Sequence, residues 1–245
     1  MAHENGPNAK GANPSADPRS RIVDALMELA AEQRFEDISI SEICAKAGVS
    51  LADFRDAFPS KGAVLAGFSK RIDRIVLQQQ TDELATEEPK ERLFDVLMRR
   101  LEAMAPYREG LREIVQWLRR EPLAALAVNQ VAINSMRFML EAAGIGSEGG
   151  AGAVKLQGLT LAWSRIVDVW LDDEEPELSK TMAALDRELT RGERLVARVE
   201  HFDRLAGPLK ALARAALETR RRAAEAFRHK ASRRAAEPDQ REQQT

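Results

Sequence analysis

The most informative stretch of the chain covers residues 39–61, SISEICAKAGVSLADFRDAFPSK. Ser39, with Glu42 three residues later, is typical of a capping box at the start of a short helix. Gly48 permits the left-handed conformation that ends this helix, and Ser50 can cap a second one. In both segments apolar residues recur every three or four positions, the spacing of a buried helical face. The pattern predicts two short helices joined by one glycine turn, the outline of a helix-turn-helix.

The same stretch resembles the DNA-binding domain of TetR-type one-component regulators. The resemblance is carried by Ala-Gly-Val-Ser at 47–50 and Phe-Pro-Ser-Lys at 58–61, which stand at the spacing found in that family. Upstream, residues 21–30 look like the family's first helix, and Phe35 looks like its usual aromatic residue. The match spans residues 18 to 75 or so. The competing interpretation is an ordinary helical hairpin with a chance Gly-Val-Ser.

The resemblance implies that the second short helix reads double-stranded DNA as part of a homodimer, since a palindromic operator requires a twofold reader. We expect Ser39, Ser50 and Lys61 to contact phosphates, and Leu51, Ala52 and Arg55 to lie nearest the bases. Asp53 and Asp56 of the same helix complete the predicted set of DNA-binding residues.

These two acids depart from the family pattern, and Arg55 stands where the family usually has tyrosine. An arginine can still contact a phosphate, but carboxylates bring negative charge toward a polyanion. Residues 1–75 contain ten Lys/Arg and eleven Asp/Glu, a net charge of −1 rather than a basic footprint. Asp53 can instead act in the cap of Ser50, and an acid can accept a hydrogen bond from cytosine. The departure weakens the DNA-reading interpretation without removing it.

Composition favours an all-α protein. Of the 245 residues, 44% are hydrophobic and 31% charged, and Ala, Leu, Glu and Arg dominate over Val, Ile, Thr and Tyr. No apolar run approaches the roughly 18 residues of a membrane span, and the first 17 residues lack the apolar stretch of a signal peptide. The single Cys44 lies on an apolar helical face and can form no internal disulfide. We expect a cytoplasmic protein.

The chain divides into four predicted parts. We expect a disordered arm at 1–17, a three-helix helix-turn-helix domain at 18–60, a larger helical effector-binding and dimerisation domain at 61–203, and a basic amphipathic helix with its tail at 204–245. Ser60 can cap a long helix that links the first domain to the second. Prolines at first-turn positions predict further helices at 89–104, 106–120 and 122–143.

Two segments of the second domain have unusual compositions. Residues 123–133 carry no charge, which predicts a helix segment buried nearly all round. Residues 144–152 are rich in glycine, but they lack the preceding strand and the lysine of a phosphate-binding loop. We interpret them as a flexible connector.

Two later helices are predicted at 153–171 and 176–202. The first carries one broad apolar stripe, made of Leu156, Leu159, Trp163, Ile166, Val167 and Trp170. The second repeats Leu178, Met182, Leu185, Leu189, Leu195 and Val199. In TetR-like proteins such a pair forms a four-helix bundle with its copy in a second subunit. The alternative interpretation is that the stripes face the protein's own core.

The sequence offers no catalytic site, no metal site and no cofactor motif. Its three histidines, His3, His201 and His229, are too scattered for a zinc site or a nucleophile–base pair. The resemblance implies instead a small apolar or amphipathic effector bound among the middle helices. Candidate wall residues are Trp117, Val128, Val131, Met136, Phe138, Met139 and Trp163, although each also fits plain core packing.

Residues 204–235 contain ten Lys/Arg and two acids, a net charge of +8, beside an apolar stripe. Such a helix could contact a membrane surface peripherally, add nonspecific phosphate contacts, or pack on its own domain. It supports a second candidate function. Lipid-binding proteins of ubiquinone biosynthesis share the TetR-like fold, end in a membrane-binding helix and do not read DNA. Residues 170–189 also resemble theirs.

Overall fold

The computed structural model describes residues 17–79 and 86–197, and its regular elements are helices, with no strand in either range. The predicted all-α fold is therefore confirmed. Contacts divide the chain into two units, Met1–Arg194 and Leu195–Thr245, and the first unit holds α1 to α8. The predicted basic helix at 204–245 and all but the last residue of the predicted arm at 1–17 lie outside the described residues, whereas Asp17 is described.

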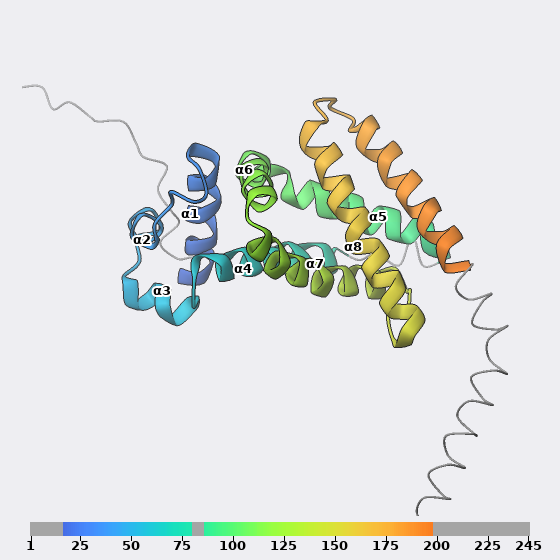
Figure 1. The fold of residues 1–245 in the computed structure, drawn as a ribbon, viewed down its shortest axis with the longest axis horizontal. Coiled ribbons are helices and arrows are strands. Elements are labelled where there is room, and N and C mark those ends of the chain that lie inside the picture. The colour runs from blue at the N-terminus through green and yellow to red at the C-terminus, as the bar shows by residue number, and fades with distance from the viewer. Residues whose placement is uncertain (1–16, 80–85, 198–245) are drawn as a thin grey trace, which may run out of the picture. The chain divides into compact units, whose positions relative to one another are not determined.

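Three helices form the helix-turn-helix unit: α1 (Pro18–Glu32), α2 (Ile40–Ala47) and α3 (Leu51–Ala57) (Figure 1). α1 begins where the Asp17 carboxylate accepts a hydrogen bond from the backbone N–H of Arg19. Its apolar face is buried, and Ile22 and Leu26 share one core with Phe35. The first helix and the aromatic residue that the sequence predicted are thus both part of this unit.

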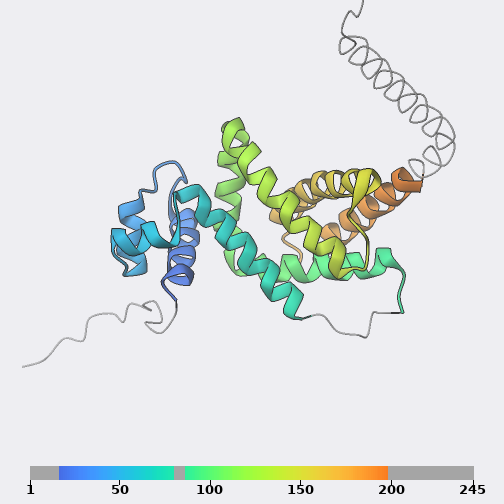
Figure 2. The ribbon, with the colours of Figure 1, turned by 90° about the horizontal axis from the view of Figure 1, so that it is seen from below.

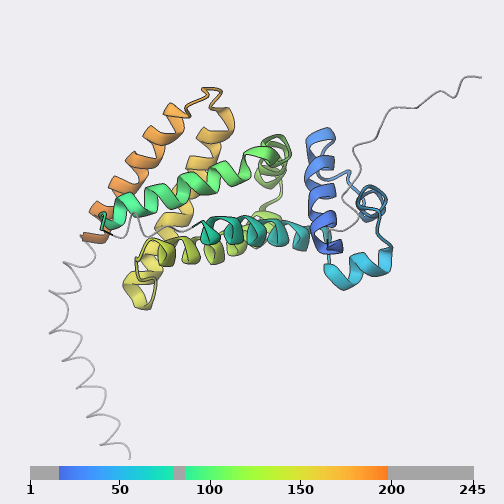
Figure 3. The same ribbon diagram turned by 180° about the vertical axis from the view of Figure 1, so that it is seen from behind.

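α4 (Lys61–Gln78) starts directly after the unit. The Ser60 hydroxyl accepts a hydrogen bond from the backbone N–H of Ala63 at 3.2 Å, which confirms the predicted cap. α4 packs on α1, on α5 and on α7, and it runs alongside α7 in Figures 2 and 3. It therefore connects the helix-turn-helix unit to the middle helices.

The middle helices are α5 (Pro89–Met104), the short 3₁₀ helix η2 (Ala105–Tyr107), α6 (Arg108–Arg120) and α7 (Pro122–Ala142). Pro89 and Pro122 stand in the first turns of α5 and α7, where proline's missing N–H costs no hydrogen bond. The helices predicted at 89–104 and 122–143 are confirmed. The segment predicted at 106–120 is η2 followed by α6.

α6 makes its most extensive contact with α1. At the crossing, Gly110 lies against the backbone of Met27, and an added Cβ would lie 2.5 Å from the Met27 carbonyl oxygen. Only glycine permits this approach without a shift. The rings of Phe35 and Trp117 pack nearby with centroids 4.4 Å apart. α6 is thus held closely to the helix-turn-helix unit.

The first half of α7 contradicts the prediction that residues 123–133 are buried nearly all round. Leu123 is 82% exposed and Leu126 is 67% exposed, and none of these eleven residues is buried. The buried residues of α7 all lie in its second half, namely Ser135, Met136, Met139 and Leu140, while the half-buried Val128 of the first half packs against the core. By length and composition alone α7 could cross a membrane, and 22% of its most apolar stretch is buried. An uncharged sequence therefore did not mean a buried helix in this chain.

α8 (Gly149–Asp172) begins earlier than predicted. The glycine-rich segment 144–152 is a connector only as far as Glu148, the N-cap, because Gly149 to Gly152 are helical. Tertiary packing of a long helix can outweigh the low helix propensity of glycine. All six residues of the predicted stripe on this helix are buried.

The last described helix covers 179–197 rather than starting at 176. The buried Asp173 carboxylate accepts hydrogen bonds from the backbone N–H and the hydroxyl of Thr181, at 2.9 and 2.7 Å. This contact ties the turn before the helix to its first residues. Leu185 and Leu189 of the predicted stripe are buried, Leu195 is 46% exposed, and Val199 lies outside the described residues.

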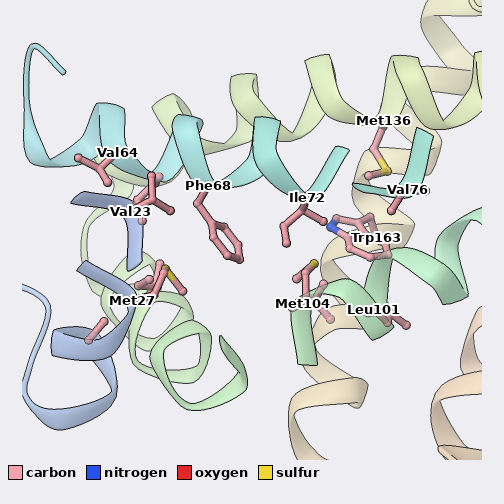
Figure 4. Close-up of a cluster of buried hydrophobic side chains, with 14 of the residues drawn as sticks. Val23, Met27, Val64, Phe68, Ile72, Val76, Leu101, Met104, Met136 and Trp163 are labelled. Carbon is pink, nitrogen blue, oxygen red and sulfur yellow. The ribbon is translucent and has the colours of Figure 1, made fainter. Parts of the chain in front are cut away.

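One apolar core runs from the helix-turn-helix unit into the middle helices. Figure 4 shows Val23 and Met27 of α1 near Phe68 of α4, and Met136 and Trp163 near Ile72 and Val76 further along α4. Phe68 also meets the ring of Tyr107 edge-on, with centroids 5.1 Å apart. A movement of α4 would therefore change the packing both in the helix-turn-helix unit and among the middle helices.

Candidate nucleic-acid interface

Both short helices of the candidate interface begin with a complete capping box. The Ser39 hydroxyl accepts from the backbone N–H of Glu42 at 3.2 Å, and the Glu42 carboxylate accepts from the backbone N–H of Ser39 at 2.8 Å. Ser50 and Asp53 repeat this arrangement at 3.0 and 2.9 Å. The predicted caps are therefore confirmed. The turn between the helices has Gly48 at φ +61°, ψ +42°, the left-handed conformation predicted for it.

An arginine of α1 stabilises this turn by hydrogen bonds to its backbone. Arg21 Nη1 donates to the carbonyl oxygens of Ala47 and Gly48, both at 3.1 Å. The free thiol of Cys44 is buried beside the turn, 3.8 Å from the carbonyl oxygen of Ser50, and burial raises its pKa. Cys44 is thus a core residue, as its apolar face predicted.

α3 exposes most of its surface. Phe54 is its one buried residue, whereas Leu51 is 60% exposed. Ala52, Asp53, Arg55 and Asp56 are exposed as well. The predicted base-contacting residues therefore lie on the solvent side of a helix that Phe54 anchors.

Lys61 does not lie on this exposed surface. Its ammonium donates to the carbonyl oxygens of Phe35 at 2.5 Å and Ile38 at 2.8 Å, with that of Glu36 at 3.5 Å. It also lies 4.5 Å from the centroid of the Phe35 ring, and burial lowers its pKa. An ammonium group has three donors, so these carbonyls leave none for a phosphate. The structure thus gives Lys61 a structural role within the unit.

The hydroxyls of Ser39 and Ser50 are engaged in a similar way. Each donates to the carboxylate of its own capping box at 2.7 Å. The hydrogen bonds from Ser50 lower the pKa of Asp53, so this acid is ionised in its cap. Asp53 is therefore explained by the start of α3, and its charge favours the positive end of the helix.

Among the Lys and Arg side chains of the helix-turn-helix unit and α4, Arg34, Lys46 and Arg71 are paired with acids. Lys46 forms ion pairs with Glu28 and Glu32, and Arg71 pairs with Asp24 at 2.7 Å. Arg55 remains exposed, with Nη1 3.5 Å from the carbonyl oxygen of Pro59. Beside it, a shallow hollow between α1 and α3 is lined by Asp17, Pro18, Arg19, Asp53, Asp56 and Ala57. Arg55 is thus the principal cation on the outer surface of α3.

The predicted effector wall is only partly assembled. Met136, Met139 and Trp163 are buried in the middle helices. Val128 and Val131 are half-buried, Phe138 is 52% exposed, and Trp117 packs against Phe35 at the junction with α1. Within residues 17–79 and 86–197, no three His, Cys, Asp or Glu side chains are placed to hold a metal ion. The three histidines lie outside these ranges.

No protein-family model and no curated protein matches the chain. Solved structures do match. A TetR transcriptional regulator from Nitrosomonas europaea ATCC 19718 superposes with a TM-score of 0.58 at 23% identity, over 73% of this chain and 99% of that one. This chain has the fold of TetR regulators. A second such regulator, from Rhodococcus sp. RHA1, gives a TM-score of 0.52 at 21% identity, over 71% and 95% of the two chains.

Two residues important to the unit could not be recognised as such from the sequence. Arg21 looked like one more charged residue of an amphipathic helix, and Lys61 looked like a phosphate contact. Both donate to backbone carbonyls that lie 23 to 27 residues away in the chain. Neither partner could be inferred from local spacing.

Proposed function

We propose that the protein is a TetR-like, DNA-binding transcriptional regulator, a repressor that releases its operator when a small apolar or amphipathic effector binds. The proposal rests on the surface of α3, where an apolar and a basic side chain are exposed side by side. It presents Leu51 at 60% exposure together with Arg55, and it is positioned by a capping box and one buried phenylalanine. A rigid helix of this kind suits the major groove.

Within this proposal, Leu51, Ala52 and Arg55 read the bases, and Asp56 lies at the edge of the contact. Leucine and alanine side chains suit thymine methyl groups, and arginine suits guanine or a phosphate. Ser39, Ser50 and Asp53 hold the short helices in place through their caps, and Lys61 holds the loop before α2.

A second copy of the chain docks on the outward faces of α7 and α8 in this proposal. Leu123, Leu126 and Phe138 of α7 and Val154 and Leu161 of α8 are exposed apolar residues. The outward positions of the 179–197 helix carry charges instead, among them Asp186, Arg187 and Arg191. Charged residues are depleted at the cores of interfaces. Of the two helices predicted to form the dimer contact, we therefore retain α8 and replace the 179–197 helix by α7.

Among the described residues, the lipid-binding alternative has only the sequence resemblance of residues 170–189. Its main argument, the basic segment 204–235, lies outside them. Two solved structures that share the fold at TM-scores above 0.5 are TetR transcriptional regulators. These similarities favour the regulator.

The proposal is tested by selecting binding sites from a pool of genomic fragments with the full-length protein. We expect one enriched, twofold-symmetric site. A double variant, Leu51→Glu with Arg55→Glu, changes only exposed side chains of α3 and should fold normally but enrich nothing. Failure of the folded wild-type protein to enrich any site would refute the function.

A further inference from the structure

α6 contacts two parts of the molecule through two different sides. Gly110, Glu113 and Trp117 recur every three or four residues, so they share one side of the helix, and all three contact the helix-turn-helix unit. Arg108 and Arg112, four residues apart, share another side and contact the end of α8. Figures 1 and 3 show α6 between α1 and that end of α8.

The side toward the helix-turn-helix unit contacts backbone as well as side chains. Gly110 lies so close to α1 that an added Cβ would be 2.5 Å from the Met27 carbonyl oxygen. The Glu113 carboxylate accepts a hydrogen bond from the backbone N–H of Phe35 at 3.1 Å, and the Trp117 ring packs on the ring of the same residue. These contacts fix α6 against both α1 and the loop that follows it.

Arg108 connects the other side of α6 to two helices. Its Nη2 donates to the carbonyl oxygens of Trp170, near the end of α8, and of Asp173, which follows α8. Its guanidinium carbon lies 5.2 Å from the centroid of the Trp170 ring. The Asp173 carboxylate in turn accepts hydrogen bonds from Thr181 at the start of the 179–197 helix. Arg108 is therefore linked to the turn between the last two described helices.

Arg112 strengthens the same contact. Its Nη2 donates to the carbonyl oxygen of Leu171, and its Nη1 donates to the Asp172 carboxylate at 3.1 Å. The last carbonyl groups of a helix lack partners within the helix and carry partial negative charge, which a guanidinium complements. Arg108 and Arg112 together thus cap the C-terminal end of α8.

These contacts give the helix-turn-helix unit a second attachment. The chain itself attaches the unit through α4, which begins directly after Ser60 and packs on α1. A body held along one helix can still turn about that helix, whereas a second attachment at another place prevents the turn. In a dimer, such a turn would change the distance between the two copies of α3, although the half-sites of an operator have a fixed spacing.

We infer that α6 fixes the orientation of the helix-turn-helix unit relative to α8, and that Arg108, Gly110 and Arg112 thereby set the half-site spacing that the protein accepts. The three are positioning residues and do not contact DNA. The orientation within one chain is independent of DNA binding. Only the consequence for half-site spacing rests on the proposed function.

Two variants disturb α6 from its two sides. The double variant Arg108→Gln with Arg112→Gln removes the guanidinium contacts with α8, and Arg112→Gln alone is a milder form in case the double variant does not fold. Gly110→Ala leaves both arginines in place but adds the Cβ that collides with the Met27 carbonyl oxygen. We expect the same result from both sides.

Arg119→Gln is the matched control. Arg119 also joins α6 to α8, through an ion pair with Asp168 at 2.8 Å, but the two side chains are 62% and 47% exposed. Exposed ion pairs of this kind contribute little to stability. This variant should therefore behave like the wild type in both measurements below.

The first measurement uses no DNA. Nitroxide labels are attached through Ala45→Cys on α2 and Ala183→Cys on the 179–197 helix, both at exposed positions, whereas Cys44 is buried. Labelled chains are diluted with unlabelled protein, so that pulsed electron paramagnetic resonance reports the distance within one chain. We expect one narrow distance peak for the wild type and for Arg119→Gln, and a broad distribution for the double variant and for Gly110→Ala.

The second measurement uses the operator selected from genomic fragments. Two base pairs inserted between its half-sites move them about 7 Å apart and rotate them by about 70°. The insertion should weaken binding about 100-fold for the wild type and only about 10-fold for the variants, because lost charge-assisted hydrogen bonds make the turn easier by roughly a factor of ten. Affinity for an isolated half-site should stay equal, since α3 is unchanged.

The inference is overturned if the wild type already has a broad distance distribution, or if the double variant and Gly110→Ala both keep the narrow peak. A broadened peak with an undiminished loss on the lengthened operator would overturn the role in half-site spacing. A wild-type protein that enriched no DNA site would refute the proposed function instead, and the distance measurement would still decide whether α6 fixes the unit.

Discussion

α3 and the first half of α7 both expose large apolar side chains, but their settings differ. On α3 the exposed Leu51 is surrounded by Asp53, Arg55 and Asp56, within a helix of seven residues. On α7 the exposed Leu123 and Leu126 lie in a stretch of eleven residues without any charge. A lone leucine among charges is ordinary surface, whereas a continuous uncharged face on a soluble protein marks a contact with another protein or a membrane.

The difference separates two kinds of recognition. DNA reading needs a few side chains of mixed chemistry on a rigid, narrow helix, since bases present both polar edges and methyl groups. Association with a second copy needs area, and it excludes charge from the centre of the contact. We therefore assign α3 to DNA, and α7 with α8 to the partner subunit.

The largest expected effect is on association. Leu126→Glu places a carboxylate on the uncharged face of α7, and its copy brings a second one across the twofold axis. Unpaired buried charges cost several kcal/mol, so the dimer dissociation constant should rise by about 100-fold or more. Sedimentation equilibrium measures it. Gln116→Glu, an equal change of charge at an exposed position of α6, should leave the dimer intact; a dimer unaffected by Leu126→Glu would move the interface elsewhere.

The next effect is on affinity for DNA. Arg55→Ala should weaken binding to the selected site by about 1 to 3 kcal/mol, the loss expected for one charged contact. Fluorescence anisotropy with a labelled duplex gives the value. Arg119→Ala on α6 removes a comparably exposed arginine, whose side chain is 62% exposed, and should change nothing. Equal losses in the two variants would show that Arg55 contributes only general charge.

A smaller effect is expected on sequence preference. Leu51→Ala removes an apolar contact with base edges, so discrimination at one base pair should fall by about 1 kcal/mol. A panel of duplexes with single substitutions identifies the position. The melting temperature should stay unchanged because Leu51 is 60% exposed. If the variant kept the full preference at every position, Leu51 would be ordinary surface.

The smallest effect concerns the cap that positions α3. Hydrogen bonds from Ser50 lower the pKa of Asp53 from its usual 3.8. The ionised carboxylate is therefore more stable in the folded protein than in the unfolded chain. Its contribution to stability is full above the unfolded pKa and disappears as the pH falls through the folded pKa. The difference in melting temperature between the wild type and Asp53→Asn should therefore shrink below about pH 3.8. A difference independent of pH would mean that the carboxylate does not carry the cap.

The sequence predicted local features of the fold well. Capping residues such as Ser39 and Ser50, the left-handed Gly48, and the prolines at the starts of α5 and α7 act within a few residues of their own position. Their effects can be worked out from spacing alone. The apolar stripe of α8 also has the period of a helix, and this spacing predicted that the stripe is buried.

The features that were missed depend on partners far away in the chain. Absence of charge in the first half of α7 indicates contact with something apolar, but not whether that partner is the same chain. The pair Arg100–Asp73 joins residues 27 positions apart, and no local spacing links the two. Lys61 matched a family tetrapeptide, yet its ammonium binds carbonyl oxygens of the loop before α2. Tertiary contacts of this kind leave no periodic trace in the sequence.

The assignment of α3 to DNA and α7 to a second copy is tested most directly by photocrosslinking. A benzophenone amino acid is placed at position 51 in one variant and at position 123 in another, which is tolerable because Leu51 and Leu123 are 60% and 82% exposed. Both are irradiated with the selected duplex. We predict that position 51 crosslinks to DNA and position 123 crosslinks to another copy of the chain. Crosslinks from position 123 to DNA, with none from position 51, would contradict the assignment.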